Sequence, residues 1–223
     1  MTWILLALGM IALAFYIPEK IRGYTVKAVL IKSVVSVLFI AVAVSASSTS
    51  RLAPFVIMGL VFGLLGDIWL DLKYVFPDSD RVFTYAGFAV FGIGHILYVS
   101  GLLLQYGGGR FLLASFGLAL VAAVLVVVTE KPMKLVYGEL KPTVAVYGFL
   151  LFSTVFVSGG LLLTRGGAAL LCFFIGSVCF AISDLILSGT YFGEGRERPV
   201  DLITNYLFYY VGQFLIACSL SFV

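Results

Sequence analysis

Long apolar runs dominate this sequence and restrict it to folds that can exist in a lipid bilayer. A transmembrane helix needs about 20 mostly apolar residues, and eight runs close to this length follow one another along the chain. Only 11% of the residues are charged, against about 25% in soluble domains. The sequence therefore predicts an all-α polytopic membrane protein with a single transmembrane domain over residues 1–223. The eight predicted transmembrane helices are Thr2–Ile17, Lys27–Ser45, Ala53–Leu72, Val82–Leu104, Phe111–Val128, Pro142–Leu163, Gly167–Ser188 and Val200–Phe222.

The first apolar run is interpreted as a retained helix and not as a cleaved signal peptide. No lysine or arginine precedes Lys20, and a small-residue cleavage site is missing.

Lysine and arginine, which favour the cytoplasmic side of a membrane, are unequally distributed over the connections. The even-numbered connections carry three: Arg51, Arg110 and Arg165. We therefore expect the odd-numbered loops in the cytoplasm and both termini outside, in the cell (inner or plasma) membrane if the source is prokaryotic. The odd-numbered connections, with the adjoining helix starts, carry eleven: Lys20, Arg22, Lys27, Lys32, Lys73, Arg81, Lys131, Lys134, Lys141, Arg196 and Arg198.

Composition also limits the expected partners and cofactors. A net charge of +3 without a basic cluster does not suggest a nucleic-acid partner. The single histidine is too few for a multi-histidine zinc site of the usual kind. Cys172, Cys179 and Cys218 form no CxxC motif and are interpreted as packing residues. We expect neither a metal nor an organic cofactor, and the bilayer is the expected surroundings.

Two aspartates inside the apolar runs are the first candidates for a functional site. Asp67 lies in the third predicted helix and Asp184 in the seventh. An aspartate near the middle of a membrane helix costs roughly 2.5–3.5 kcal/mol on insertion scales, and such residues are functional candidates by default. No cation is expected inside the membrane to neutralise them. The two carboxyl groups should therefore be protonated, hydrogen-bonded to each other, or in contact with water.

The two aspartates also mark a possible internal duplication. His95 follows Asp67 by 28 residues, and Gln213 follows Asp184 by 29, so the two pairs are offset by 117 or 118 positions. Four helices in each half would keep both halves in the same orientation, as in transporters with parallel repeats. We expect a 4+4 parallel repeat with halves at residues 1–110 and 111–223.

Other polar residues lie close to the two aspartates in the predicted helices. Asp71 follows Asp67 by one helical turn on the same face, although a solvated helix end next to Lys73 is an equal alternative. At about 1.5 Å per residue, Asp67 and Asp184 should lie roughly 8 Å from the cytoplasmic ends of their helices. The set predicts a polar pocket that opens toward the cytoplasmic leaflet. Its further candidates are His95 and Tyr98 on the fourth helix and Asn205, Tyr209 and Gln213 on the eighth.

Each of these residues also has a purely structural interpretation. His95 could be a hydrogen-bonding group between helices. Tyr206, Tyr209 and Tyr210 could be packing or interfacial aromatic residues.

Two buried carboxyl groups without metal ligands suggest acid–base chemistry. One acid that donates a proton and one carboxylate that stabilises positive charge is the arrangement of glycoside hydrolysis. No Gly-x-Ser-x-Gly motif is present, and Ser183 is a weak nucleophile candidate without a nearby base. A hydrolase or isomerase acting on lipids and a proton-coupled transporter both remain open on the residues alone.

Four ordered motifs resemble the YhhN family of integral membrane proteins, which includes the lysoplasmalogenases. The resemblance covers nearly the whole chain, and only the ordered set of motifs is specific. The motifs are Gly66-Asp67-x-x-Leu70, Phe83-x-x-x-Gly87-x-x-x-Phe91-x-x-Gly94-His95-Ile96-x-Tyr98, Phe180-x-x-Ser183-Asp184-x-x-Leu187 and Tyr209-Tyr210-x-x-Gln213-x-Leu215-Ile216.

The resemblance implies hydrolysis of the vinyl-ether bond of a lysoplasmalogen, a lysophospholipid taken from the bilayer. The products would be a fatty aldehyde and glycerophosphocholine or glycerophosphoethanolamine. Asp67 and Asp184 match the acidic motifs and would be catalytic. The residues that would orient water and the glycerol hydroxyl are Asp71, His95, Tyr98, Asn205, Tyr209 and Gln213. The alternative is a proton-coupled transporter of a small molecule or lipid.

Overall fold

The computed structural model describes residues 1–23, 25–47, 49–194 and 198–223. These residues form eight long helices, each long and apolar enough to cross a membrane, so the prediction of an all-α protein with eight spans is confirmed. The helices are α1 (Thr2–Arg22), α2 (Val26–Ala46), α3 (Leu52–Val75), α4 (Asp80–Tyr106), α5 (Phe111–Val128), α6 (Lys141–Arg165), α7 (Ala168–Phe192) and α8 (Pro199–Ser219), with short 3₁₀ turns η1 (Pro77–Ser79), η2 (Gly138–Leu140) and η3 (Leu220–Phe222).

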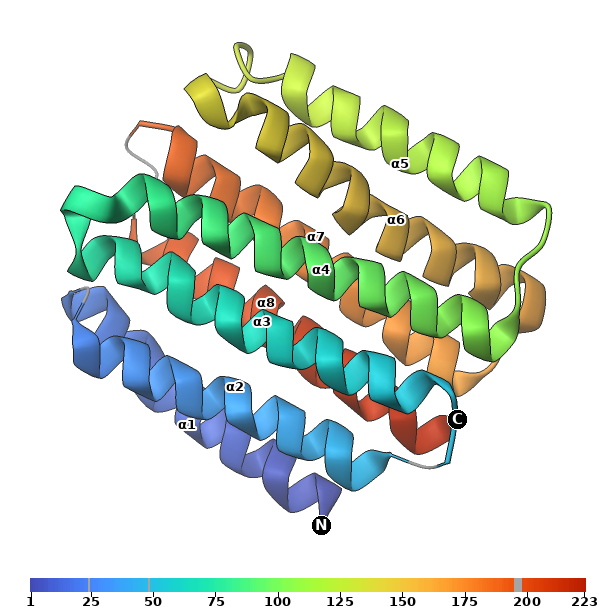
Figure 1. Ribbon diagram of the computed structural model, residues 1–223. Coiled ribbons are helices and arrows are strands. Elements are labelled where there is room, and N and C mark those ends of the chain that lie inside the picture. Colours follow the sequence, from blue (N-terminus) through green and yellow to red (C-terminus); the bar gives the residue numbers. More distant parts are fainter. Residues whose placement is uncertain (24, 48, 195–197) are drawn as a thin grey trace.

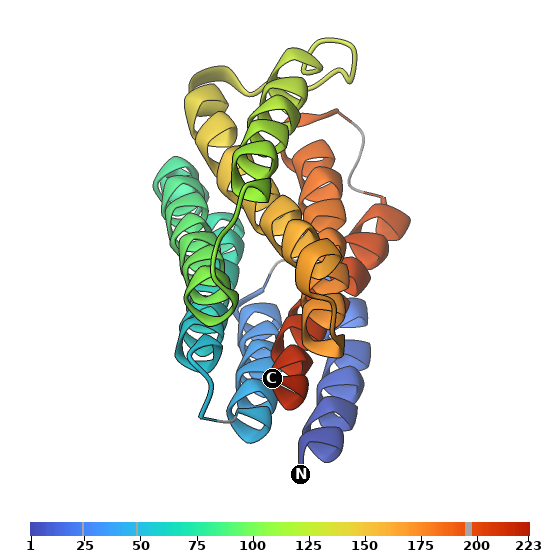
Figure 2. The same cartoon turned by 90° about the vertical axis from the view of Figure 1, so that its right-hand side faces the viewer.

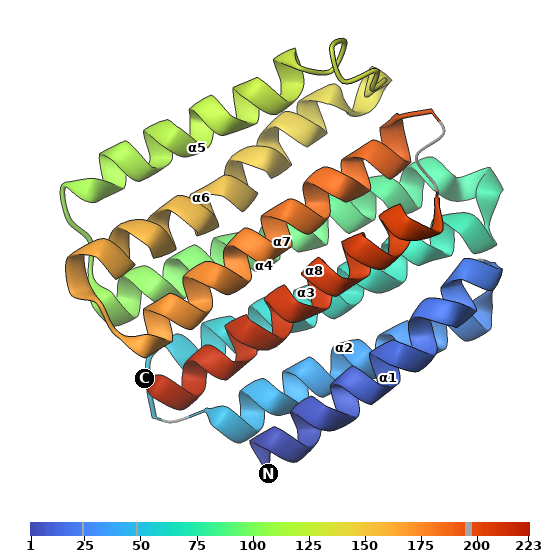
Figure 3. The same cartoon turned by 180° about the vertical axis from the view of Figure 1, so that it is seen from behind.

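Four helices, α3, α4, α7 and α8, form the centre of the bundle (Figure 1). The α1–α2 pair flanks them on one side, because α2 packs on α3 and α8. The α5–α6 pair flanks them on the other side, because α6 packs on α4 and α7. Figure 2 shows these two pairs at opposite edges of the bundle, and Figure 3 shows α7 and α8 side by side.

The helix neighbours are alike in the two halves of the chain. The contact of α2 with α8 has its counterpart in the contact of α6 with α4. The α3–α4 and α7–α8 pairs, which carry the motifs, are equivalent in the same way. The duplication itself remains a prediction.

Glycines allow the central helices to approach closely. A Cβ atom on Gly212 of α8 would lie only 2.8 Å from the Gly176 carbonyl oxygen of α7, and a Cβ atom on Gly176 would lie 2.8 Å from the Gly212 carbonyl oxygen. On α3, Gly59 faces the Tyr98 ring, and a Cβ atom on Gly63 would lie 2.7 Å from Gln213 Nε2. Small residues at a helix interface allow such backbone approach.

The two aspartates lie deeper in their helices than their apolar runs indicated. Helix α3 continues to Val75 and α7 to Phe192, so Asp67 and Asp184 each lie eight residues before a helix end. At 1.5 Å per residue this is about 12 Å, where the sequence indicated about 8 Å. An apolar run ends where polar residues begin, whereas helical hydrogen bonding continues through them.

Both termini lie at one end of the bundle, and the four odd-numbered connections lie at the other end (Figure 1). This arrangement follows from an even number of spans. The cytoplasmic placement of the odd-numbered connections stays a prediction. Of the residues that support it, Arg196 lies outside the described residues, and Arg198 pairs with Asp201 at 2.8 Å.

The connection between α5 and α6 folds back over the end of the bundle. The Val136 amide donates to the Phe192 carbonyl at 2.8 Å, and Leu135 forms an isolated antiparallel bridge with Gly193. Glu130 holds this connection at its base: its carboxylate accepts from the Tyr137 amide at 2.8 Å and from Lys141 Nζ at 2.7 Å. Leu135 and Tyr137 are buried there in a small apolar cluster with Val144, against Phe88, Val126 and Phe192.

We expect the stability contribution of Glu130 to depend on pH. The hydrogen bond from Lys141, followed by that from the Tyr137 amide, holds the pKa of the Glu130 carboxyl below its ordinary value of 4.5. A lowered pKa stabilises the folded state above the unfolded value, and this contribution is lost as the pH falls through the folded pKa. Melting curves in detergent should show Glu130→Gln less stable than wild type at pH 7, with the difference shrinking as the pH falls below the ordinary pKa of 4.5. A difference independent of pH would contradict this role.

Candidate functional site

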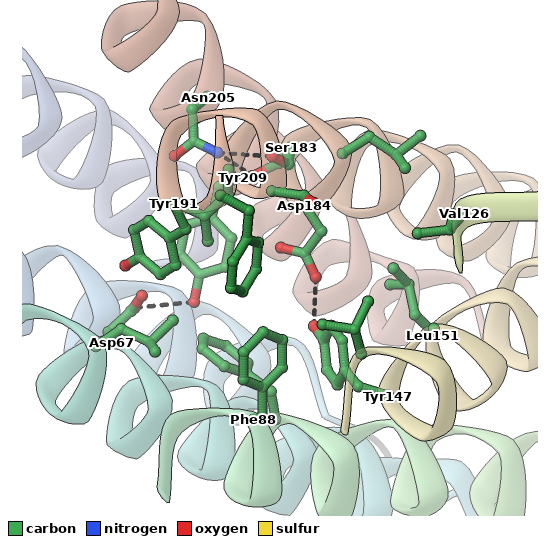
Figure 4. A pocket seen from close by; sticks show the side chains of 18 of the residues that line it. Asp67, Phe88, Val126, Tyr147, Leu151, Ser183, Asp184, Tyr191, Asn205 and Tyr209 are labelled. Atoms are coloured by element: carbon green, nitrogen blue, oxygen red, sulfur yellow. Dashed lines mark hydrogen bonds between the residues drawn. The ribbon is translucent and has the colours of Figure 1, made fainter. Parts of the chain in front are cut away.

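Asp67 and Asp184 line a single cavity between α3, α4, α6, α7 and α8 (Figure 4). About 80 Å³ of the cavity is open to the centres of water-sized molecules, and all of its empty space, open solvent included, is about 880 Å³. It lies in the half of the bundle nearest the odd-numbered connections. Its polar side chains are Lys32, Asp67, Tyr147, Ser183, Asp184, Ser188, Tyr191, Asn205, Tyr206 and Tyr209. The rest of its wall is mostly aliphatic and aromatic, including Leu70, Phe88, Phe91, Val126, Val144, Leu151, Phe152, Leu185, Leu187 and Phe192.

Asp67 is held by three groups from other helices. Its Oδ2 accepts hydrogen bonds from Ser36 Oγ of α2 at 2.7 Å and from Tyr209 OH of α8 at 2.8 Å. Its Oδ1 lies 3.2 Å from Lys32 Nζ. Asp67 is only 3% exposed. A cation and two donors compensate a buried negative charge and hold the carboxylate in one orientation.

The expectation that no cation lies inside the membrane is wrong. Two buried lysines, Lys20 of α1 and Lys32 of α2, meet the carboxylates of α3. Lys20 Nζ lies 2.8 Å from Asp71 Oδ1, and Lys32 Nζ lies 3.4 Å from the same oxygen. Both lysines are near the ends of their apolar runs, where lysine normally extends toward the interface. Here their side chains turn inward instead, because α3 presents two carboxylates to them.

Asp71 is buried, which contradicts its interpretation as a solvated helix end. It is only 2% exposed. It does not line the cavity. It lies behind Asp67, between the two lysines.

Asp184 has different surroundings from Asp67. Tyr147 OH of α6 donates a hydrogen bond to Asp184 Oδ2 (Figure 4). None of the ion pairs among the described residues includes Asp184. Neighbouring Ser183 accepts from Asn205 Nδ2 through its carbonyl oxygen at 2.7 Å and its hydroxyl at 3.1 Å. In the part of the chain that the structure describes, the cavity therefore joins an ion-paired carboxylate and a carboxyl group that has no ion-pair partner.

His95, Tyr98 and Gln213 do not line the cavity. His95 Nδ1 lies 3.1 Å from Thr154 Oγ1, and its buried Nε2 has no partner among the described residues. Tyr98 OH donates to Gln213 Oε1 at 3.3 Å, and Gln213 Nε2 donates to the Tyr209 hydroxyl at 3.1 Å. A hydrogen-bonded chain therefore runs from Tyr98 to Tyr209 and on to Asp67.

Of the residues selected from the sequence, four line the cavity: Asp67, Asp184, Asn205 and Tyr209. Three residues of the site were not predicted from the sequence: Lys32, Ser36 and Tyr147. Lys32 could have been found from its position within the second apolar run, whereas a single tyrosine or serine in a membrane helix gives no comparable signal. Among the described residues, no group of three or more His, Cys, Asp or Glu side chains could hold a metal ion.

A family model described as the YhhN family matches residues 27–220 of this chain. The match covers most of the sequence, and it confirms the resemblance drawn from the four motifs. No match was found among curated proteins or among solved structures.

Lys32→Met should destabilise the fold strongly. Among the described residues, it would leave Asp67 without an ion-pair partner and Asp71 with Lys20 alone, and breaking a buried pair costs about 3–5 kcal/mol. Lys27→Met is the matched control, because Lys27 is 68% exposed in its pair with Glu19 and such pairs contribute about 0–1 kcal/mol. Unfolding in detergent measures both variants. Equal stability of the two would contradict the buried ion pairs.

Proposed function

Because this chain belongs to the YhhN family of membrane proteins, we propose that it is a lysoplasmalogenase-type hydrolase. Its substrate would be a lysophospholipid whose hydrocarbon chain is joined to glycerol by a vinyl ether. Water would cleave that bond to give a fatty aldehyde and a glycerophospho-alcohol, such as glycerophosphocholine or glycerophosphoethanolamine. Family membership is consistent with this activity.

One observation carries the proposal: the cavity holds two carboxyl groups in unlike surroundings. Asp67 faces Lys32 at 3.2 Å and accepts two hydrogen bonds, which favours a carboxylate. Asp184 has a tyrosine hydroxyl as its hydrogen-bond partner. In an apolar cavity a carboxyl group without a cation is held more readily with its proton. One acid and one carboxylate are what vinyl-ether hydrolysis requires.

In the proposed reaction, Asp184 protonates the outer carbon of the double bond, which is the one not bonded to the ether oxygen. The electron pair of the double bond forms the new C–H bond. Positive charge then develops on the ether oxygen and on the inner carbon, which is bonded to it. The Asp67 carboxylate stabilises this oxocarbenium ion. Water then attacks the inner carbon and returns a proton to the Asp184 carboxylate. The hemiacetal breaks its bond to the glycerol oxygen, which takes the hydroxyl proton, and the aldehyde is released.

The cavity wall suits the remaining parts of a lysolipid. The hydrocarbon chain would lie along Phe88, Leu151 and Phe152. Asn205 and Tyr209 are at the polar side, where the glycerol hydroxyl would lie. Asp71, His95, Tyr98 and Gln213 would orient the site indirectly, through the groups that line it.

The direct test is to incubate purified protein in detergent with a lysoplasmenyl lipid and to measure fatty aldehyde, with and without a metal chelator. We expect aldehyde in equal amounts with and without the chelator. A proton-coupled transporter could use the same buried acids. It would instead move a solute across vesicles and release no aldehyde.

Removing either carboxyl group should abolish most of the activity. Asp184→Asn removes the proton donor and Asp67→Asn removes the negative charge, and general acid catalysis contributes about 10²–10⁴-fold. Asp78→Asn, at an exposed position in η1, should change kcat by no more than about twofold. Aldehyde release by folded, monodisperse protein measures all three. Full activity of both cavity variants would exclude this mechanism.

Tyr147→Phe tests whether the orientation of the Asp184 carboxyl group matters. Loss of one hydrogen bond of about 0.5–1.5 kcal/mol should lower kcat by roughly 2–10-fold. Tyr85→Phe is the control, because Tyr85 OH donates to the Glu139 carbonyl at an exposed site. If both variants kept wild-type kcat, Tyr147 would have no part in the reaction.

A further inference from the structure

A row of four buried charges extends from the cavity to α1. The order is Asp67, Lys32, Asp71 and Lys20, with successive distances of 3.2, 3.4 and 2.8 Å. All four side chains are at most 7% exposed. Asp67 and Lys32 line the cavity, whereas Lys20 and Asp71 lie behind them.

The row contains two ammonium groups and two carboxylates, so its charges balance. Lys32 is the shared member, because its Nζ contacts both Asp67 Oδ1 and Asp71 Oδ1. Lys20 is closer to Asp71 than Lys32 is, and contacts the same oxygen. Lys20 therefore neutralises Asp71 and leaves Lys32 available to Asp67.

Helix α1 is well placed to hold Lys20 there. Tyr16 is fully buried, and its ring packs edge-on against Tyr206 of α8 at a centroid distance of 5.0 Å. One helical turn later, Lys20 is 2% exposed. The family match begins at Lys27, so this charge comes from a helix outside the matched segment.

We propose that Lys20 is a positioning residue for the reaction. It acts through Asp71 and Lys32 to keep the Asp67 carboxylate paired and oriented at the cavity wall. The proposal rests on the proposed function, since Asp67 is the group whose role Lys20 would support.

A purely structural Lys20 would anchor α1 and do no more. The two roles differ in what happens when Asp71 is also removed. Without Lys20, the Asp71 carboxylate competes with Asp67 for Lys32. If Asp71 is neutral as well, this competition ends, and the Lys32–Asp67 pair is restored although α1 has still lost its anchor.

The experiment is a double-mutant cycle of Lys20→Met and Asp71→Asn in the full chain, with Lys20→Arg as the conservative variant. Aldehyde release from a lysoplasmenyl lipid gives kcat and KM, and melting in detergent gives stability for each variant. Such cycles isolate the coupling between two residues in contact.

We expect Lys20→Met to lower kcat by about 10-fold or more, with little change in KM, because Asp67 acts on the transition state. The double variant should recover to within about threefold of wild type, since the Asp67–Lys32 pair is again balanced. Lys20→Arg should retain most of the kcat.

A double variant no more active than Lys20→Met, or a Lys20→Met variant with wild-type kcat, would overturn the proposal. If Lys20→Met does not fold, the comparison of Asp71→Asn with the double variant decides. Their kcat values should agree if Lys20 acts only through Asp71. A lower kcat in the double variant than in Asp71→Asn would refute the proposal.

The melting data separate this proposal from the proposed function. If wild type releases no aldehyde, the proposed function fails. The charge row is then judged by stability alone: the double variant should melt above Lys20→Met if the charges are coupled as the distances indicate. If wild type is active and the cycle shows no coupling, only the role of Lys20 fails.

Discussion

A charged side chain in the interior of a membrane protein needs a partner, and this requirement organises one side of the bundle. Asp67 and Asp71 lie one turn apart on α3, and two lysines from α1 and α2 reach them at 2.8–3.4 Å. Since each of these groups is almost fully buried, none is stable alone. The pairing therefore joins α1, α2 and α3 and fixes the carboxylate of Asp67 at the cavity wall.

On the opposite wall of the cavity, the contacts of Asp184 differ from those of Asp67. Asp184 meets the hydroxyl of Tyr147 on α6, and the approach of α7 to α8 through Gly176 and Gly212 brings its helix against the one that carries Tyr209. One carboxyl group is thus surrounded by compensating charge and the other by neutral groups. This inequality, and not the presence of two acids alone, is what makes proton donation by one and charge stabilisation by the other a consistent proposal.

The parts that were predictable from the sequence are those that depend on hydropathy. The eight spans follow from apolar runs, and Asp67 and Asp184 stood out because an acid inside such a run is costly. Lys20 and Lys32 were misinterpreted because a lysine near the end of a run normally reaches the interface. The position of Lys32 within the second apolar run was a signal for a buried charge, but the inward direction of both side chains is visible only in the three-dimensional arrangement. The contact of Tyr147 with Asp184 was equally hidden, since it joins two helices through a residue type common in membrane helices.

The most direct measurement is the reaction carried out in deuterated water, with the aldehyde reduced at once to the alcohol and analysed by mass spectrometry and chiral chromatography. In the proposed reaction, Asp184 would take its proton from solvent and would face the substrate from one wall of the cavity. The account therefore predicts a single deuterium on the carbon next to the former carbonyl, added to one face. A product without deuterium at this carbon, or with deuterium equally on both faces, would contradict proton delivery by a fixed carboxyl group.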